Sequence, residues 1–135
     1  MKHIVILGST GSVGTQTLDV VRSYREQFRV IGLSAHTNID LLKKQINEFH
    51  PVVVCLTNAD AAKRLCAQIN QPDILVGTKS LLELVREKSV DMVINALVGT
   101  VGILPTLTAI EHKKDVAIAN KEAIVCAGDL VMSAI

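Results

Sequence analysis

The chain has 135 residues, of which 49% are hydrophobic, and a formal net charge of +1 from 14 basic and 13 acidic side chains. This length corresponds to about one domain. The balanced charge gives no electrostatic reason to expect nucleic acid, and one Tyr, two Phe and no Trp offer no stacking platform for bases. No apolar run approaches the length of about 18 residues that a membrane helix needs, so we expect no membrane partner either.

The cellular compartment is indicated by the cysteines and by the amino terminus. Cys55, Cys66 and Cys126 are odd in number and unrelated in spacing, which favours reduced thiols over a disulfide framework or a metal site. Lys2 and His3 precede only four apolar residues, so no signal peptide is visible. We therefore expect a cytoplasmic protein.

Short apolar runs alternate with amphipathic stretches along the whole chain. The predicted strands are residues 4–7, 30–33, 52–56, 73–76, 92–95 and 116–119. The predicted helices are residues 13–25, 40–49, 59–70, 80–88 and 103–112. This alternation predicts the α/β class, with a doubly wound, mainly parallel sheet of about six to seven strands, as in a Rossmann-type NAD(P)-binding domain.

Three glycines follow the first predicted strand and lead into the first predicted helix. Gly8, Gly11 and Gly14 are spaced three residues apart, which allows a sharp turn and close packing of the helix on its strand. At such a helix N-terminus, unpaired backbone N–H groups and the helix dipole favour an anion. The motif therefore predicts a phosphate cradle, and the alternative is a glycine-rich turn without a ligand.

The apolar face of the first predicted helix can be assigned from the helical period. Five side chains share one face, which we expect to pack on the sheet. They are Val13, Thr17, Leu18, Val21 and Tyr24.

The end of the second predicted strand bears on the choice between NAD and NADP. No carboxylate occurs there before Asp40, although an Asp or Glu at this place typically binds the ribose hydroxyls of NAD. His36, Thr37 and Asn38 stand there instead and can donate hydrogen bonds to a 2′-phosphate. The segment favours NADP, and the alternative is that Thr37 and Asn38 only cap the next helix.

A second polar segment, Asn120-Lys121-Glu122, follows the last predicted strand. Open α/β sheets bind ligands at the carboxyl ends of their strands. Lys121 could therefore hold an anionic substrate, and Asn120 and Glu122 could contact the cofactor. The alternative is that Asn120 caps a helix whose first turn carries the charged neighbours.

Four segments together resemble the 1-deoxy-D-xylulose 5-phosphate reductoisomerase family. They are Gly8-Ser-Thr-Gly-Ser-Val-Gly14, Leu18-Asp-Val-Val21, Gly102-Ile-Leu-Pro-Thr-Leu107 and Ala119-Asn-Lys-Glu122. The resemblance covers the whole chain but only the N-terminal, NADPH-binding domain of that enzyme. It implies that residues 1–135 form this domain, and that a metal- and substrate-binding catalytic domain and a C-terminal helical domain lie beyond the chain end. The end of the chain, a helix-like segment without a stop signal, favours the same expectation.

The resemblance also implies a reaction. Members of this family rearrange 1-deoxy-D-xylulose 5-phosphate, a phosphosugar, and reduce the product with NADPH to 2-C-methyl-D-erythritol 4-phosphate in non-mevalonate isoprenoid biosynthesis. They use Mg²⁺ or Mn²⁺ as a Lewis acid, and the full-length enzyme is expected to be a homodimer. The resemblance places neither the metal ligands nor a catalytic residue within this chain, so the fragment alone is expected to be inactive.

The positions that match the family's contacts fall into three groups. Those expected at the pyrophosphate and the nearby ribose are Thr10, Gly11, Ser12 and Val13. Those expected around the adenosine 2′-phosphate are His36, Thr37 and Asn38. The remaining cofactor contacts are Asn120 and Glu122, with Lys121 as a substrate contact.

Two other functions remain open from the sequence. One is a non-catalytic dinucleotide-binding module, such as a redox sensor or regulatory subunit, that uses the same cradle. The other is a different NADP-dependent reductase, which would have little use for Asn120-Lys121-Glu122.

Overall fold

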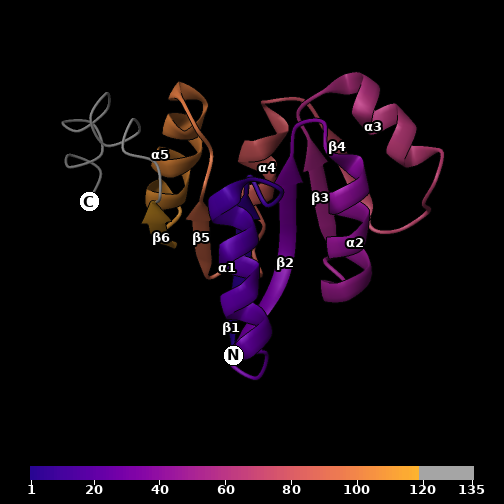
Figure 1. Ribbon diagram of the computed structural model, residues 1–135. Helices are drawn as coiled ribbons and strands as arrows, with labels where there is room; N and C mark the ends of the chain where they lie inside the picture. Colours follow the sequence, from indigo (N-terminus) through magenta and orange to yellow (C-terminus); the bar gives the residue numbers. More distant parts are fainter. Residues whose placement is uncertain (119–135) are drawn as a thin grey trace.

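The computed structural model describes residues 1–118 and contains one six-stranded sheet in which all neighbouring strands run parallel (Figure 1). The strands are β1 (Lys2–Leu7), β2 (Phe28–Ala35), β3 (Val53–Leu56), β4 (Asp73–Val76), β5 (Met92–Asn95) and β6 (Asp115–Ile118). Their order in the sheet is β4-β3-β2-β1-β5-β6. The predicted α/β class and doubly wound sheet are therefore confirmed, with six strands in the described residues.

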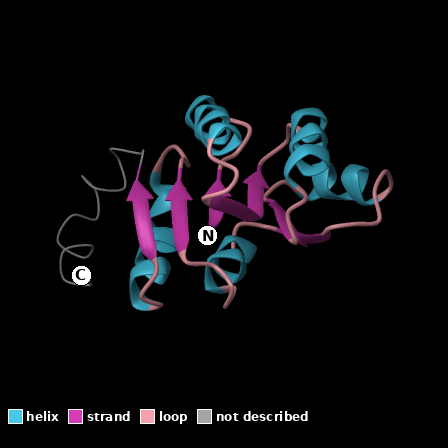
Figure 2. Ribbon diagram, turned by 90° about the horizontal axis from the view of Figure 1, so that it is seen from below, coloured by secondary structure: helices cyan, strands magenta, loops and turns pink. Residues whose placement is uncertain are grey.

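Helices cover both faces of the sheet (Figure 2). They are α1 (Ser12–Ser23), α2 (Ile39–Phe49), α3 (Ala59–Cys66), α4 (Ser80–Arg86) and α5 (Ile103–Glu111), with a 3₁₀ turn η1 (Thr100–Gly102) before α5. The helices divide the core in two, because one buried cluster joins α1, α2 and α3 to the sheet and the other joins α4 and α5 to it. No helix among residues 1–118 has the length and apolar character needed to cross a membrane.

The sequence of the central strand β1 does not alternate between apolar and polar residues, because both of its faces are buried. Ile4 and Ile6 point into the cluster beneath α1–α3, and Val5 and Leu7 into the cluster beneath α4 and α5. All four side chains are fully buried. A strand covered on both faces is necessarily apolar at every position.

The sheet reverses its direction of winding at β1. From β1 the chain moves outward through β2 and β3 to β4, and then crosses back to β5, which pairs with β1 on its other side. In open parallel sheets, such a reversal leaves a crevice outside the carboxyl ends of the two strands, where ligands bind. The fold therefore predicts a site above the ends of β1 and β5.

The first and third helices differ from the sequence prediction. Helix α1 buries Leu18 and Val21 as predicted, but Val13 and Tyr24 are exposed, by 40% and 52%. Val13 lies in the first turn of α1, and Tyr24 is the C-cap residue, whose φ of −128° and ψ of 43° are no longer helical. Helix α3 ends at Cys66, four residues earlier than predicted, because the chain must turn back to enter β4.

Helix α1 packs unusually closely against the turn that follows β1. A Cβ atom added at Gly14 would lie 2.6 Å from the Cα and 2.8 Å from the carbonyl carbon of Ser9, and still closer to the carbonyl oxygen of Gly8. These are backbone atoms and cannot move aside like a flexible side chain. The position therefore requires glycine.

We predict that Gly14→Ala lowers the free energy of unfolding by about 2 to 3 kcal/mol, because the added methyl group forces α1 away from the turn. Gly11→Ala is the matched control. A Cβ atom at Gly11 would meet only the Gly8 carbonyl oxygen, at 3.5 Å, which is an ordinary contact. Urea unfolding followed by circular dichroism measures both changes, and equal stability of the two variants would contradict the close packing.

Candidate functional site

A cavity of about 490 Å³ lies at the carboxyl ends of the strands, where the fold predicts a ligand site. Its walls come from the β1–α1 turn, the ends of β2, β3 and β4, and the segment after β5. The lining residues are Gly8, Thr10, Gly11, Ser12, Val13, Ser34, Ala35, His36, Thr57, Thr78, Leu81, Ala96, Leu97, Val98 and Val101.

The floor of the cavity is the N-terminus of α1, which has the geometry that favours an anion. The backbone N–H groups of Ser12, Val13 and Gly14 have no hydrogen-bond partner among residues 1–118. The N-cap residue, Gly11, provides no side-chain cap, and the first turn of α1 carries no acidic residue. Of these three residues, Ser12 and Val13 line the cavity, so two unpaired N–H groups and the positive end of the helix dipole lie at its floor.

Two glycines leave room for a ligand beside these N–H groups. Gly8 has a φ of 79°, which L side chains rarely adopt, and a Cβ atom there would lie 3.1 Å from the Ala96 carbonyl oxygen. At Gly11 the space on the cavity side is open, since only the Gly8 carbonyl oxygen lies within 4 Å of an added Cβ atom. The tight glycine turn and the open space that the glycine spacing predicts are therefore both present.

Buried hydrogen bonds fix the β1–α1 turn to β2 and to α2. The Ser9 hydroxyl donates to Gln45 Oε1 at 2.8 Å, and Gln45 Nε2 donates to the Ser9 carbonyl at 2.9 Å. The Ser9 N–H donates to the Ser34 carbonyl at 2.8 Å, and the Gly8 N–H donates to the Ser34 hydroxyl at 2.9 Å. Because Ser9, Ser34 and Gln45 are all buried, this network holds the cradle in one conformation.

The opposite wall of the cavity is held in a similar way. Asn95, the last residue of β5, is fully buried and donates through Nδ2 to the Gly102 carbonyl at 2.8 Å and to Thr106 Oγ1 at 2.7 Å. Its Oδ1 accepts a hydrogen bond from the Leu97 N–H at 3.2 Å. One amide side chain thus ties the segment after β5 to the first turn of α5.

The structure brings half of the residues predicted from the sequence to this cavity. Thr10, Gly11, Ser12, Val13 and His36 line it.

The other predicted residues do not line it. Thr37 and Asn38 are exposed at the start of α2, where Asn38 accepts a hydrogen bond from the Leu41 N–H at 3.2 Å, so the capping role considered for it is confirmed. The predicted site residues Asn120, Lys121 and Glu122 lie outside the described residues, and so does Cys126.

Some lining residues were missed at the sequence level. Ser34, Thr57 and Thr78 lie at or just beyond the ends of β2, β3 and β4, and Leu97 lies just beyond β5. The rule that ligands bind at the carboxyl ends of parallel strands could have found them. Gln45 gave no such signal, because nothing in the sequence indicates that a glutamine in the middle of α2 contacts Ser9.

The described residues of the site offer little charge and no activated thiol. None of the lining residues is Lys, Arg, Asp or Glu, and residues 1–118 contain no cluster of His, Cys, Asp or Glu that could hold a metal ion. Cys55 is a buried residue of β3, and burial raises the pKa of its thiol to about 12, so it remains protonated at neutral pH.

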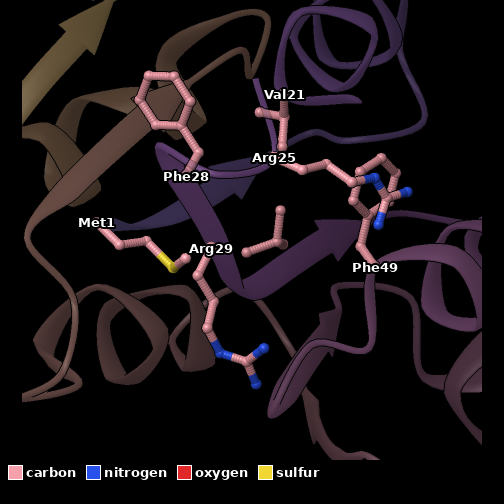
Figure 3. Close-up of a pocket in the computed structure, with 7 residues that line it drawn as sticks. Met1, Val21, Arg25, Phe28, Arg29 and Phe49 are labelled. Atoms are coloured by element: carbon pink, nitrogen blue, oxygen red, sulfur yellow. The ribbon is translucent and has the colours of Figure 1, made fainter. Parts of the chain in front are cut away.

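Another cavity, of about 200 Å³, lies at the amino-terminal ends of the strands, near the start of β1 and β2 (Figure 3). There the Arg25 guanidinium stacks 4.8 Å from the centre of the Phe49 ring. Arg25 and Arg22 both pair with Glu48, and the hydrogen bond from Arg22 lowers the pKa of that carboxyl group. These contacts join α1 to α2, and they are remote from the carboxyl ends of the strands.

A cavity at the winding reversal of a parallel sheet, with the N-terminus of a helix and a glycine-rich turn in its floor, is the architecture of a Rossmann-type dinucleotide-binding domain. Residues 4–128 match the family model described as 1-deoxy-D-xylulose 5-phosphate reductoisomerase. The chain belongs to this family.

Relatives with established names agree with this assignment. The 1-deoxy-D-xylulose 5-phosphate reductoisomerase of Thermoanaerobacter pseudethanolicus is 49% identical over 133 residues, which cover 98% of this chain and 35% of that protein. The enzyme of Bacillus cereus strain Q1 is 48% identical over 134 residues, 99% of this chain and 35% of the relative. The chain thus spans about a third of the length of the relatives that it matches.

Solved structures show the same fold. A crystal structure of DOX-P reductoisomerase in complex with NADPH, fosmidomycin and magnesium has a TM-score of 0.94 at 35% identity, covering 99% of this chain and 34% of that one. The Zymomonas mobilis enzyme in complex with NADPH has a TM-score of 0.91 at 29% identity, covering 98% and 35%. A homoserine dehydrogenase from Thiobacillus denitrificans, at 20% identity and a TM-score of 0.59, shares the fold alone.

We predict that Gln45→Leu lowers the free energy of unfolding by about 1 to 3 kcal/mol, because the buried Ser9 hydroxyl and carbonyl lose their two hydrogen bonds to Gln45. Chemical unfolding of Gln45→Leu, Ser9→Ala and the double variant forms a double-mutant cycle. The double variant should lose less stability than the sum of the single losses, since it leaves fewer polar groups unpaired. Strict additivity would show that the Ser9–Gln45 contact contributes nothing.

Proposed function

We propose that this chain binds NADPH and forms the cofactor-binding part of an enzyme that converts 1-deoxy-D-xylulose 5-phosphate to 2-C-methyl-D-erythritol 4-phosphate. The observation that carries the proposal is the N-terminus of α1, where Ser12 and Val13, whose backbone N–H groups are unpaired among residues 1–118, line a cavity of about 490 Å³. The family assignment and the two related structures with NADPH support it. When bound, NADPH supplies the hydride for the reduction step.

The residues of the cavity fit this cofactor. The open side of Gly11 and the N–H groups of Ser12 and Val13 suit the pyrophosphate, with Thr10 beside them. His36 suits the region of the 2′-phosphate, and the lining contains no carboxylate that would repel a phosphate. We propose that Thr37 and Asn38, the next residues along the chain, complete that region.

The substrate side of the proposed function rests on the family assignment. We propose that Lys121 contacts the phosphosugar and that Asn120 and Glu122 contact the cofactor. We propose that the Mg²⁺ or Mn²⁺ ion of the reaction is held outside residues 1–118, which contain no cluster of His, Cys, Asp or Glu suited to a metal ion. A magnesium ion and fosmidomycin occur in the related structure with NADPH. We further propose a homodimeric full-length enzyme and a cytoplasmic location, which the membership of the family and the cysteine pattern support.

We predict that the chain binds NADPH more tightly than NADH, and that Gly11→Val abolishes NADPH binding because the side chain fills the space for the pyrophosphate. Isothermal titration calorimetry measures both affinities, and circular dichroism checks that the variant is folded. Ser23→Val, at the other end of α1, is the control and should bind NADPH normally. Equal affinities for the two nucleotides would contradict the NADP preference, and normal binding by a folded Gly11→Val variant would refute the cradle.

A chimera tests the reaction itself. In it this chain replaces the 133 matching residues of the Thermoanaerobacter pseudethanolicus relative. We expect the chimera to oxidise NADPH only when 1-deoxy-D-xylulose 5-phosphate and a divalent metal ion are both present. A folded chimera that binds NADPH without oxidising it would favour the alternative of a non-catalytic binding module.

A further inference from the structure

His36 is the one ionisable group among the described residues that line the cavity, apart from hydroxyl groups. It follows directly after β2, at the side of the cavity away from β5. A phosphate bound on this side would therefore find no lysine or arginine in the described lining. Among the described lining residues, the side chains that could recognise it are the imidazole and neutral hydrogen-bond donors.

Thr57 holds the His36 ring in place. The distance between His36 Nδ1 and Thr57 Oγ1 is 2.7 Å, which is a short hydrogen bond. The backbone of Thr57 is itself fixed, because its N–H donates to the Ala35 carbonyl at 3.1 Å. The two residues meet because β2 and β3 are paired with Ala35 opposite Leu56, so that the residue after each strand lies beside the other.

This hydrogen bond bears on what the other ring nitrogen can do. A threonine hydroxyl can donate to Nδ1, and the proton of a neutral imidazole then resides on Nε2. Nε2 lies on the other side of the ring and has no hydrogen-bond partner among residues 1–118. The imidazole can therefore present an N–H donor to an anion without being charged.

We propose that Thr57 is a positioning residue that sets the preference for NADPH over NADH by orienting His36 toward the 2′-phosphate. The proposal rests on the proposed function, since it presupposes that NADPH occupies the cavity. It goes beyond that function because it assigns the selectivity to a contact between the ends of two neighbouring strands, 21 residues apart in the sequence. The phosphate-bearing ribose is the part of the ligand that this contact recognises.

The test compares Thr57→Val, which removes the hydroxyl at nearly constant volume, with Thr57→Ser, which keeps it. The ligands are NADPH, NADH and adenosine 2′-monophosphate, titrated into the chain by calorimetry. Without the Thr57 hydroxyl, the His36 ring is no longer held toward the 2′-phosphate, and its hydrogen bond to that charged group is lost. We therefore expect Thr57→Val to weaken binding of NADPH and of adenosine 2′-monophosphate about tenfold. The affinity for NADH should not change, and Thr57→Ser should bind all three ligands like the unaltered chain.

A double-mutant cycle shows whether Thr57 acts through His36. His36→Ala should weaken NADPH binding at least as much as Thr57→Val, and the double variant should be no weaker than His36→Ala alone. Thermal unfolding of each variant reports any general loss of structure, which is relevant because Asn58, the N-cap of α3, follows Thr57.

Three results would overturn the proposal, and they can be told apart. If Thr57→Val leaves the ratio of NADPH to NADH affinity unchanged, Thr57 does not set the selectivity although the proposed function stands. If the effects of His36→Ala and Thr57→Val simply add, Thr57 does not act through His36. If the unaltered chain binds no NADPH, the proposed function and this inference both fail.

Discussion

The close approach of α1 to the carboxyl end of β1 is the constraint on which the rest of the site depends. Gly14 lets the first turn of the helix pack directly on the backbone of Gly8 and Ser9. Only in that position do the N–H groups at the start of α1 open into the space beside β5. A side chain at this contact would move the helix away from the strand, and the anion cradle would lose both its position and its rigidity.

Polar groups that are buried around this contact convert a flexible glycine turn into a fixed one. Ser9, Ser34 and Gln45 satisfy one another on one side of the turn, and Asn95 holds the segment after β5 on the other. Each of these groups would be costly to bury without its partners, so the network has one favourable arrangement. The cradle is thereby organised before a ligand arrives, which reduces the ordering that binding requires.

Much of the fold could be predicted from the sequence, because both faces of the sheet are covered. Strands such as β1 must then be apolar throughout, and they stand out from amphipathic helices without any knowledge of the partners. The helix ends were less predictable. Tyr24 continues the apolar period of α1 in the sequence, yet it lies beyond the last helical turn and is exposed.

The candidate site was predictable where its residues are close together in the sequence. The spacing of Gly8, Gly11 and Gly14 and the lack of a carboxylate after β2 indicated a phosphate cradle with a preference for NADP. The structure has the tight glycine turn and the unpaired N–H groups that such a cradle requires. The contacts of His36 with Thr57 and of Ser9 with Gln45 join residues 21 and 36 positions apart. Only the tertiary structure decided these contacts, because the first depends on the register of β2 against β3 and the second on where α2 packs relative to the β1–α1 turn. The sequence by itself determined the strand, the turn and the helix that make the cradle, since each follows from local backbone preferences.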